Sequence, residues 1–137
     1  MTKYRGIRKD NGEWVEGNLV NNLWGYFIIQ HFGIQNEIIV SSIASQVIPE
    51  SISLFTTLTD KTGKEIFGSI PVNGVMSRGG DVLKFNYDNF VQIEKPIEWS
   101  GNGFWVKGEN DSNFLPAMSG TEIIGNQYDS EMKGDTK

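Results

Sequence analysis

Short alternations of apolar and polar residues dominate the N-terminal part of the chain and predict strands. Segments 3–8 and 13–20 flank Asn11-Gly12, a pair that tolerates the positive φ angles of a tight hairpin turn. In the second segment Val15 and Leu19 fall on one face, with polar residues between them. The pattern predicts an antiparallel hairpin at the start of the chain.

Two further strands are predicted to extend this hairpin. Asn21-Asn22 is expected to turn the chain into strand 23–30, and a turn near Phe32-Gly33 leads to strand 37–40. The result would be a four-stranded antiparallel meander. Residues 41–46 are interpreted as a connector with room for one helical turn.

The rest of the chain also predicts short strands separated by turns. Residues 68–80 are rich in glycine, proline and asparagine and predict an exposed loop or short hairpin. Almost nothing is apolar beyond Asp129, so 129–137 is expected to be a flexible tail and 1–128 a single β domain. The remaining predicted strands are 51–58, 64–67, 81–86, 90–99, 104–107 and 122–125.

Composition supports the strand prediction. The chain has 15 Ile and 9 Val but only 6 Leu and 2 Ala, and branched residues favour pleated strands over helices. Sixteen Gly supply turns throughout. We therefore predict a mainly β fold: a small antiparallel barrel-like or two-sheet domain built from hairpins, with little helix.

The residue types that catalysis requires are scarce. No cysteine is present, which excludes thiolate chemistry, and His31 is the only histidine, which excludes histidine metal clusters. A catalytic triad would have to use His31, whose place at the end of a predicted strand favours a structural role. No phosphate-binding glycine motif is complete. We identify no catalytic, cofactor-binding or metal-ligating residues and predict a non-enzymatic protein. A carboxylate-pair enzyme stays open as an alternative, because such a pair leaves no sequence motif.

Charge narrows the set of partners. Seventeen acidic against twelve basic residues give a net charge of −5, which disfavours a general phosphate-binding surface. Lys3, Arg5, Arg8 and Lys9 cluster at the start, and we interpret them as charges that guard an edge strand. The alternative is a small nucleic-acid-binding barrel that uses this cluster with a neighbouring aromatic residue.

Tryptophan is frequent, at positions 14, 24, 99 and 105, and most of these side chains are expected to pack in the core or at an interface. The longest uninterrupted apolar run, 26–29, is far shorter than the ~20 residues of a membrane span. The basic start of the chain is not followed by the apolar core of a secretory signal. These features predict a cytoplasmic protein that does not contact membranes.

Three segments resemble the YopX family of phage and prophage proteins. They are the opening KYRGIRKDNGEWVEG (3–17), VIPESISLFTTLTDKTGKEIF (47–67) and EIIGNQYD (122–129). The family's middle segment continues directly into a strand beginning Glu-Gly-Asp, whereas here the nearest match is Gly80-Asp81, so residues 68–79 are interpreted as an inserted loop. The resemblance implies a mainly β, barrel-like domain encoded by a phage or prophage. It implies no activity and no functional residues.

From these observations we predict a phage- or prophage-encoded accessory protein in the cytoplasm of a bacterial host. It is expected to act through self-association or through contacts with a host or phage protein. The alternative function is nucleic-acid binding by a small β-barrel, which the acidic charge disfavours.

Overall fold

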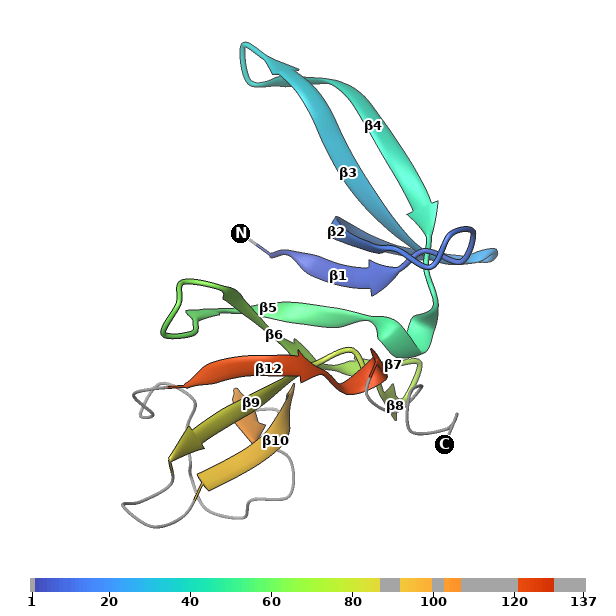
Figure 1. Ribbon diagram of the computed structural model, residues 1–137. Helices are drawn as coiled ribbons and strands as arrows, with labels where there is room; N and C mark the ends of the chain where they lie inside the picture. Colours follow the sequence, from blue (N-terminus) through green and yellow to red (C-terminus); the bar gives the residue numbers. More distant parts are fainter. Residues whose placement is uncertain (1, 87–91, 100–102, 107–120, 130–137) are drawn as a thin grey trace.

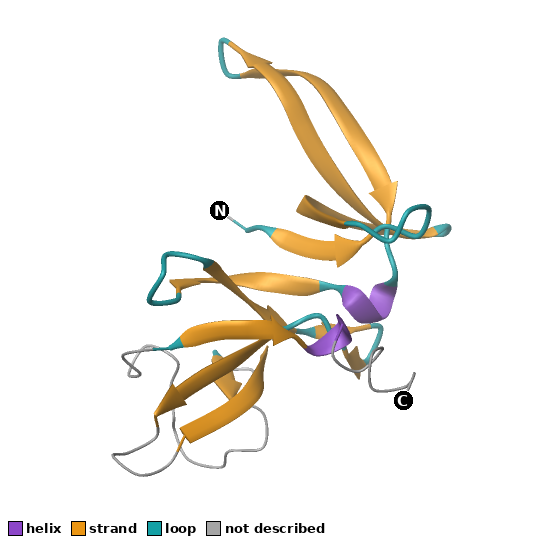
Figure 2. Cartoon of the chain, in the orientation of Figure 1, coloured by secondary structure: helices purple, strands orange, loops and turns teal. Residues whose placement is uncertain are grey.

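The computed structural model describes residues 2–86, 92–99, 103–106 and 121–129, and almost all of this chain is β-structure (Figure 2). One 3-10 turn, η1 (Pro49–Ser51), and one helical turn at 127–129 complete it. The strands are β1 (Tyr4–Ile7), β2 (Trp14–Asn22), β3 (Gly25–Gln35), β4 (Ile38–Gln46), β5 (Ser53–Thr59), β6 (Glu65–Ser69), β7 (Pro71–Val72), β8 (Val75–Met76), β9 (Asp81–Asn86), β10 (Gln92–Trp99), β11 (Phe104–Val106) and β12 (Glu122–Asn126).

Ten strands form one sheet in the order β12-β9-β10-β6-β5-β1-β2-β3-β4, with β11 paired to β10. Most neighbours are antiparallel, but β10 runs parallel to β6 at Glu98 and Ser69. Strands β7 and β8 make a separate small hairpin. The mainly β prediction is confirmed. Among the described strands β4 and β12 remain as edges, so the sheet does not close into a barrel.

The predicted N-terminal meander is confirmed, since β1, β2, β3 and β4 are sequential antiparallel neighbours. Its two later turns lie elsewhere than predicted. Asn21 and Asn22 pair with Tyr26 and Gly25, which leaves Leu23 and Trp24 as the turn.

The next turn is at Asn36 and Glu37, not near Phe32-Gly33. Both turn residues have positive φ angles, 53° and 65°, as a type I′ hairpin requires. The later turn lengthens both strands, so the predicted helical turn within 41–46 is wrong. Those residues are the second half of β4 and pair with β3 throughout.

Beyond Ile29, β3 pairs with β4 alone. At Gly17, where β2 leaves β1 and begins to pair with β3, an added Cβ would clash with the carbonyl oxygen of Ile29. Figure 1 shows the outer part of the β3–β4 hairpin standing away from the rest of the sheet. We call residues 30–43 the distal arm.

Buried apolar side chains form two clusters. One joins Ile66, Leu83, Phe85 and Ile97, and the other joins Val15, Ile28, Val47, Ile52 and Val72. The second cluster draws on β2, β3, the β7–β8 hairpin and the residues that follow β4 and η1. The segment interpreted as a loop at 68–79 therefore contributes a buried side chain, Val72, through a short hairpin.

Several predicted elements lie wholly or partly outside the described residues. They are the tail predicted at 129–137, of which only Asp129 is described, the end of the strand predicted at 104–107 and the start of the strand predicted at 90–99.

We expect Leu83→Ala to lower the free energy of unfolding by about 3 kcal/mol, because it removes buried methyl groups and leaves a cavity. The control is Ile124→Ala in β12, where the side chain is exposed and the loss should be below about 1 kcal/mol. Chemical denaturation followed by tryptophan fluorescence measures both. Equal losses would contradict the placement of the core.

Candidate functional site

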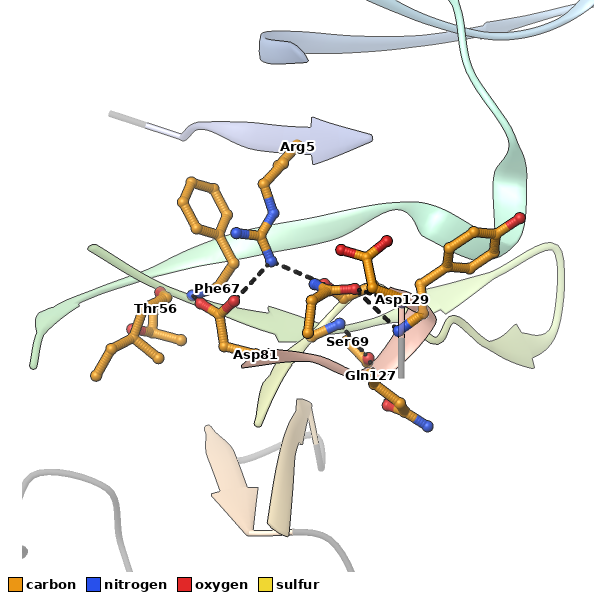
Figure 3. A network of polar contacts seen from close by, with 12 residues as sticks. Arg5, Thr56, Phe67, Ser69, Asp81, Gln127 and Asp129 are labelled. Atoms are coloured by element: carbon orange, nitrogen blue, oxygen red, sulfur yellow. Dashed lines mark hydrogen bonds and ion pairs between the residues drawn. The ribbon is translucent and has the colours of Figure 1, made fainter. Parts of the chain in front are cut away.

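A buried ion pair joins the first strand to the C-terminal half of the sheet (Figure 3). Arg5 in β1 approaches Asp81 at the start of β9, with 3.0 Å between Nη2 and Oδ1. The same Nη2 donates to the carbonyl oxygen of Gly79 at 2.8 Å, and Asp81 Oδ2 accepts the backbone N–H of Phe67 at 2.8 Å. The two side chains are only 15% and 4% exposed, so both charges depend on each other for compensation.

Two aromatic rings hold the guanidinium of Arg5. Its Cζ lies 4.7 Å from the ring centre of Trp14 and 4.3 Å from that of Phe67. Both distances are within the range of cation–π attraction. The Nε of Arg5 is buried and has no hydrogen-bond partner among the described residues. Arg5 is thus packed as a structural cation and is not presented to solvent.

The segment before Asp81 is tied into the same network. Gly80 donates its N–H to Ser69 Oγ at 2.8 Å, and Asn126 Nδ2 donates to the carbonyl oxygen of Gly79 at 2.6 Å. Added Cβ atoms at Gly79 and Gly80 would clash with backbone atoms of neighbouring segments. Glycine is required here because the end of η1, β6 and β10 approach this turn so closely.

A second buried carboxylate, Asp60, closes the β5–β6 turn. Its Oδ1 accepts the N–H groups of Thr62 and Lys64 and the hydroxyl of Thr62, and its Oδ2 accepts the N–H of Ile123. Burial acts to raise the pKa of Asp60, but the hydrogen bonds from Thr62, Ile123 and Lys64 outweigh it and lower the pKa to about 2. Asp60 therefore holds the turn against β12 most strongly while it is ionised.

The pKa of Asp81 moves in the opposite direction. Burial raises it, and the charge of Arg5 and the N–H of Phe67 offset only part of that effect. Asp81 therefore binds its proton more tightly in the folded state than in the unfolded chain. Its contribution to stability falls as the pH rises from the ordinary pKa of an aspartate through the raised pKa of the folded state. The two aspartates therefore have opposite effects on stability in acid.

A cavity of about 240 Å³ lies beside the ion pair and is lined in part by Glu16, Glu65 and Asp81. Acidic side chains therefore do meet in one cavity, as the alternative of a carboxylate-pair enzyme requires. Lys3 Nζ lies 2.6 Å from Glu65 and 3.7 Å from Glu16, and Arg5 pairs with Asp81, so each acid has a cation beside it. Among the described residues no group of three or more Asp, Glu or His could hold a metal ion.

The basic cluster predicted at the N-terminus does not form one cationic surface. Lys3 and Arg5 are paired as described, and Arg8 Nη2 lies 2.7 Å from Asp10 Oδ2. Lys9 donates its backbone N–H to the carbonyl oxygen of Gln46, next to the end of β4. Three of the four cations are therefore engaged by carboxylates of the same chain.

None of the three tryptophans whose side chains are described is fully buried, which differs from the expected core packing. Trp14 is half-buried beneath Arg5, and Trp99 meets Phe104 edge to face at 5.3 Å. Trp24 is 76% exposed beside the still more exposed Leu23, at the tip of the β2–β3 hairpin. The expected core packing does not hold for Trp24, and the side chain of Trp105 lies outside the described residues.

The distal arm is the other exposed apolar surface. Phe32 is 45% exposed and Ile43 is 51% exposed. From Gly25 to Gln46 the sequence has one charged residue, Glu37 at the turn. His31 lies here, with Nε2 3.0 Å from Asn18 Nδ2, and belongs to a cavity of about 450 Å³ at the base of the arm.

The sequence itself contains a signal that identifies this exposed surface. Residues 38–46 are IIVSSIASQ, a nine-residue strand without proline or charge. Edge strands usually carry one of these protections. Together with the turn at Asn36-Glu37, this run could have identified β4 as an unprotected edge.

Comparison with known proteins gives no relative: no family model matches the chain, and neither a curated protein nor a solved structure does. Among the described residues, no helix is long and apolar enough to cross a membrane.

We expect Asp81→Asn to cost about 3 kcal/mol of unfolding free energy at pH 7, because it leaves the buried charge of Arg5 without its counter-ion. Asparagine keeps an oxygen for the N–H of Phe67, but its amide nitrogen replaces the oxygen that accepts from Arg5, so the variant removes the charge together with that hydrogen bond. Adding Arg5→Met should restore part of the loss, as measured by urea unfolding. Simple additivity of the two changes would contradict a coupled pair, and Asp10→Asn serves as an exposed control.

Asp60 gives the chain a specific sensitivity to acid. Its lowered pKa means that its stabilising effect is present above pH 4 and is lost as the pH falls toward about 2. We expect Asp60→Asn to cost about 2 kcal/mol at pH 7 and progressively less toward pH 2. Urea unfolding at several pH values tests this, and a constant difference between the two proteins would contradict it.

Proposed function

We propose that this chain is a non-enzymatic accessory protein that acts through protein–protein contacts, with the distal arm as its contact surface. The observation that carries the proposal is that this arm is a two-stranded ribbon that exposes Phe32 and Ile43. A lone two-stranded hairpin is marginally stable in water, whereas three or more strands sharing an apolar face are stable. The arm thus needs a partner more than any other described part of the sheet does.

The polar part of the chain supports the same proposal. The buried charges around Arg5 hold the sheet together, and the acids beside them are paired with Lys3 and Arg5. A general acid–base pair needs groups that exchange protons with a substrate. An ion network with each acid held by a cation is better suited to stability than to proton transfer.

The origin in a phage or prophage, and the bacterial cytoplasm as location, are proposed from the YopX resemblance and from the sequence. The two longer resembling segments, 3–17 and 47–67, supply β1, η1, β5, β6 and the first part of β2. These elements form the base from which the arm extends. The partner is then a second copy of this chain or a host or phage protein.

Nucleic-acid binding is the less favoured function. Phosphate binding draws on cations free to replace counterions. Here Lys3, Arg5 and Arg8 already contact carboxylates, and the net charge is −5. Salt-sensitive binding of a single-stranded oligonucleotide would favour this alternative over the proposal.

A charged residue placed on the distal arm tests whether the arm is the contact surface. We expect the wild type to self-associate and Ile43→Lys to weaken that association at least tenfold, because a buried lysine would have to lose its hydration. Val75→Lys, at a more exposed apolar position on the β7–β8 hairpin (70% exposed, against 51% for Ile43), should leave it unchanged. Light scattering coupled to size-exclusion chromatography measures the mass.

Two results would contradict the proposal. One is a wild type that stays monomeric up to about 1 mM, which corresponds to an association free energy weaker than about −4 kcal/mol, and that also captures no protein in a pull-down from host lysate. The other is equal weakening by Ile43→Lys and Val75→Lys, which would mean that the arm is not the contact surface.

A further inference from the structure

Two hairpin turns of the structure contain the same dipeptide, an asparagine followed by a glycine. One is Asn11-Gly12, between β1 and β2, and the other is Asn73-Gly74, between β7 and β8. In a third such pair, Asn102 lies outside the described residues. Because glycine has no side chain, its backbone nitrogen can approach the side-chain amide of the asparagine before it. Both turns are therefore candidates for deamidation that needs no enzyme.

Deamidation needs no co-reactant other than water. The glycine nitrogen loses its proton and bonds to Cγ of the asparagine, the bond from Cγ to Nδ2 breaks, and ammonia leaves with that proton. Water then opens the resulting succinimide ring. Cleavage of the bond between the nitrogen and Cγ gives aspartate, and cleavage of the bond to the main-chain carbonyl carbon gives isoaspartate, which adds a methylene to the backbone. Either product adds one negative charge to a chain whose net charge is −5.

The turn at Asn73-Gly74 leaves both reacting groups free. The two residues are exposed and have φ angles of 54° and 81°, as a type I′ turn requires. Among the described residues, neither the side-chain amide of Asn73 nor the N–H of Gly74 has a hydrogen-bond partner. A Cβ added to Gly74 would meet nothing within 4 Å. No neighbouring group therefore restrains the amide or shields the nitrogen that attacks it.

The turn at Asn11-Gly12 holds the same two groups in place. Gly12 donates its N–H to the carbonyl oxygen of Arg8 at 3.0 Å, so the attacking nitrogen is already engaged. Asn11 Oδ1 accepts the N–H of Glu13 at 2.9 Å, and Asn11 Nδ2 donates to Glu13 Oε2 at 3.3 Å. Attack at this turn would have to break these bonds first. The two turns thus have the same chemistry but different protection.

The two hairpins also differ in how easily they open, and the backbone of a type I′ turn must rotate before the nitrogen can reach Cγ. The β7–β8 hairpin has only two residue pairs, and short two-stranded hairpins are marginally stable in water. At its base Ser77 donates its N–H to the carbonyl oxygen of Ile70 at 2.8 Å, and Ile70 donates its N–H to Ser77 Oγ at 3.1 Å. Opening of 71–76 leaves these bonds intact and exposes one core side chain, Val72. The β1–β2 hairpin has four pairs within the large sheet.

We propose that Asn73 is a site of spontaneous deamidation in the folded protein, which converts the β7–β8 turn to an aspartyl or isoaspartyl form. The site lies outside the distal arm, so this inference goes beyond the proposed function. Asn73 and Glu50 line the same cavity of about 190 Å³, and the new carboxylate there repels Glu50. The isoaspartyl form also lengthens the turn between β7 and β8, which weakens the packing of Val72 in the core.

Peptide mapping by mass spectrometry, after storage in mildly alkaline buffer, measures the reaction at each turn. Cleavage after basic residues isolates 65–78, in which Asn73 is the only asparagine, and additional cleavage after glutamate isolates Asn11 in 10–13. We expect Asn73 in the folded protein to lose its amide at least tenfold faster than Asn11, because its turn opens locally. In strong denaturant the two rates should converge. Equal rates at the two sites in the folded protein would overturn the proposal.

Two variants separate local opening from global unfolding. Leu83→Ala weakens the other core cluster and should leave the deamidation rate of Asn73 unchanged, because the hairpin opens without the sheet. Asn73→Gly removes the amide and keeps a turn sequence that suits type I′ geometry. After storage this variant should keep its urea midpoint, whereas the midpoint of the wild type should fall. A faster reaction at Asn73 in Leu83→Ala overturns the local site, and equal falls in the two midpoints overturn the effect on the hairpin.

Discussion

The buried pair of Arg5 and Asp81 is the interaction on which the rest of the fold depends. It connects β1, in the N-terminal meander, to β9, in the C-terminal half, and the two residues are 76 positions apart in the chain. The rings of Trp14 and Phe67 belong to β2 and β6, so four strands contribute to one guanidinium site. Buried charge pairs add little net stability compared with apolar packing, but a broken pair is costly. The pair thus favours one arrangement of the two halves over others.

The distal arm results from a different constraint, which is how far each strand extends along its neighbours. Strand β2 is shared between β1 and β3, and the crossing at Gly17 leaves the outer half of β3 with β4 as its sole described neighbour. In the base of the sheet each strand packs against a core cluster. In the arm the same kind of sequence, rich in isoleucine, has no second layer among the described residues. The apolar exposure of Phe32 and Ile43 is a result of topology as much as of composition.

Local patterns were enough to predict the class of fold and the N-terminal meander. Alternation in 13–20 and the Asn11-Gly12 turn act over a few residues, and the structure confirms both. Turn positions were harder, because Asn21-Asn22 and Asn36-Glu37 both have turn chemistry and strand pairing selected only the second. The Arg5–Asp81 pair, the cavity beside it and the bracing of Gly79 join segments distant in sequence, and no local pattern encodes them.

The separation of Arg5 from Asp81 also has a consequence for synthesis on a ribosome, which releases the N-terminus first. The meander from β1 to β4 needs only its own residues and can pair as soon as it emerges. The guanidinium of Arg5, however, has no counter-ion until Asp81 has been translated, and the edge of β1 has no neighbour until β5 follows. During that interval the nascent chain presents open edges on both β1 and β4, which makes it vulnerable to pairing with other nascent copies on the same message.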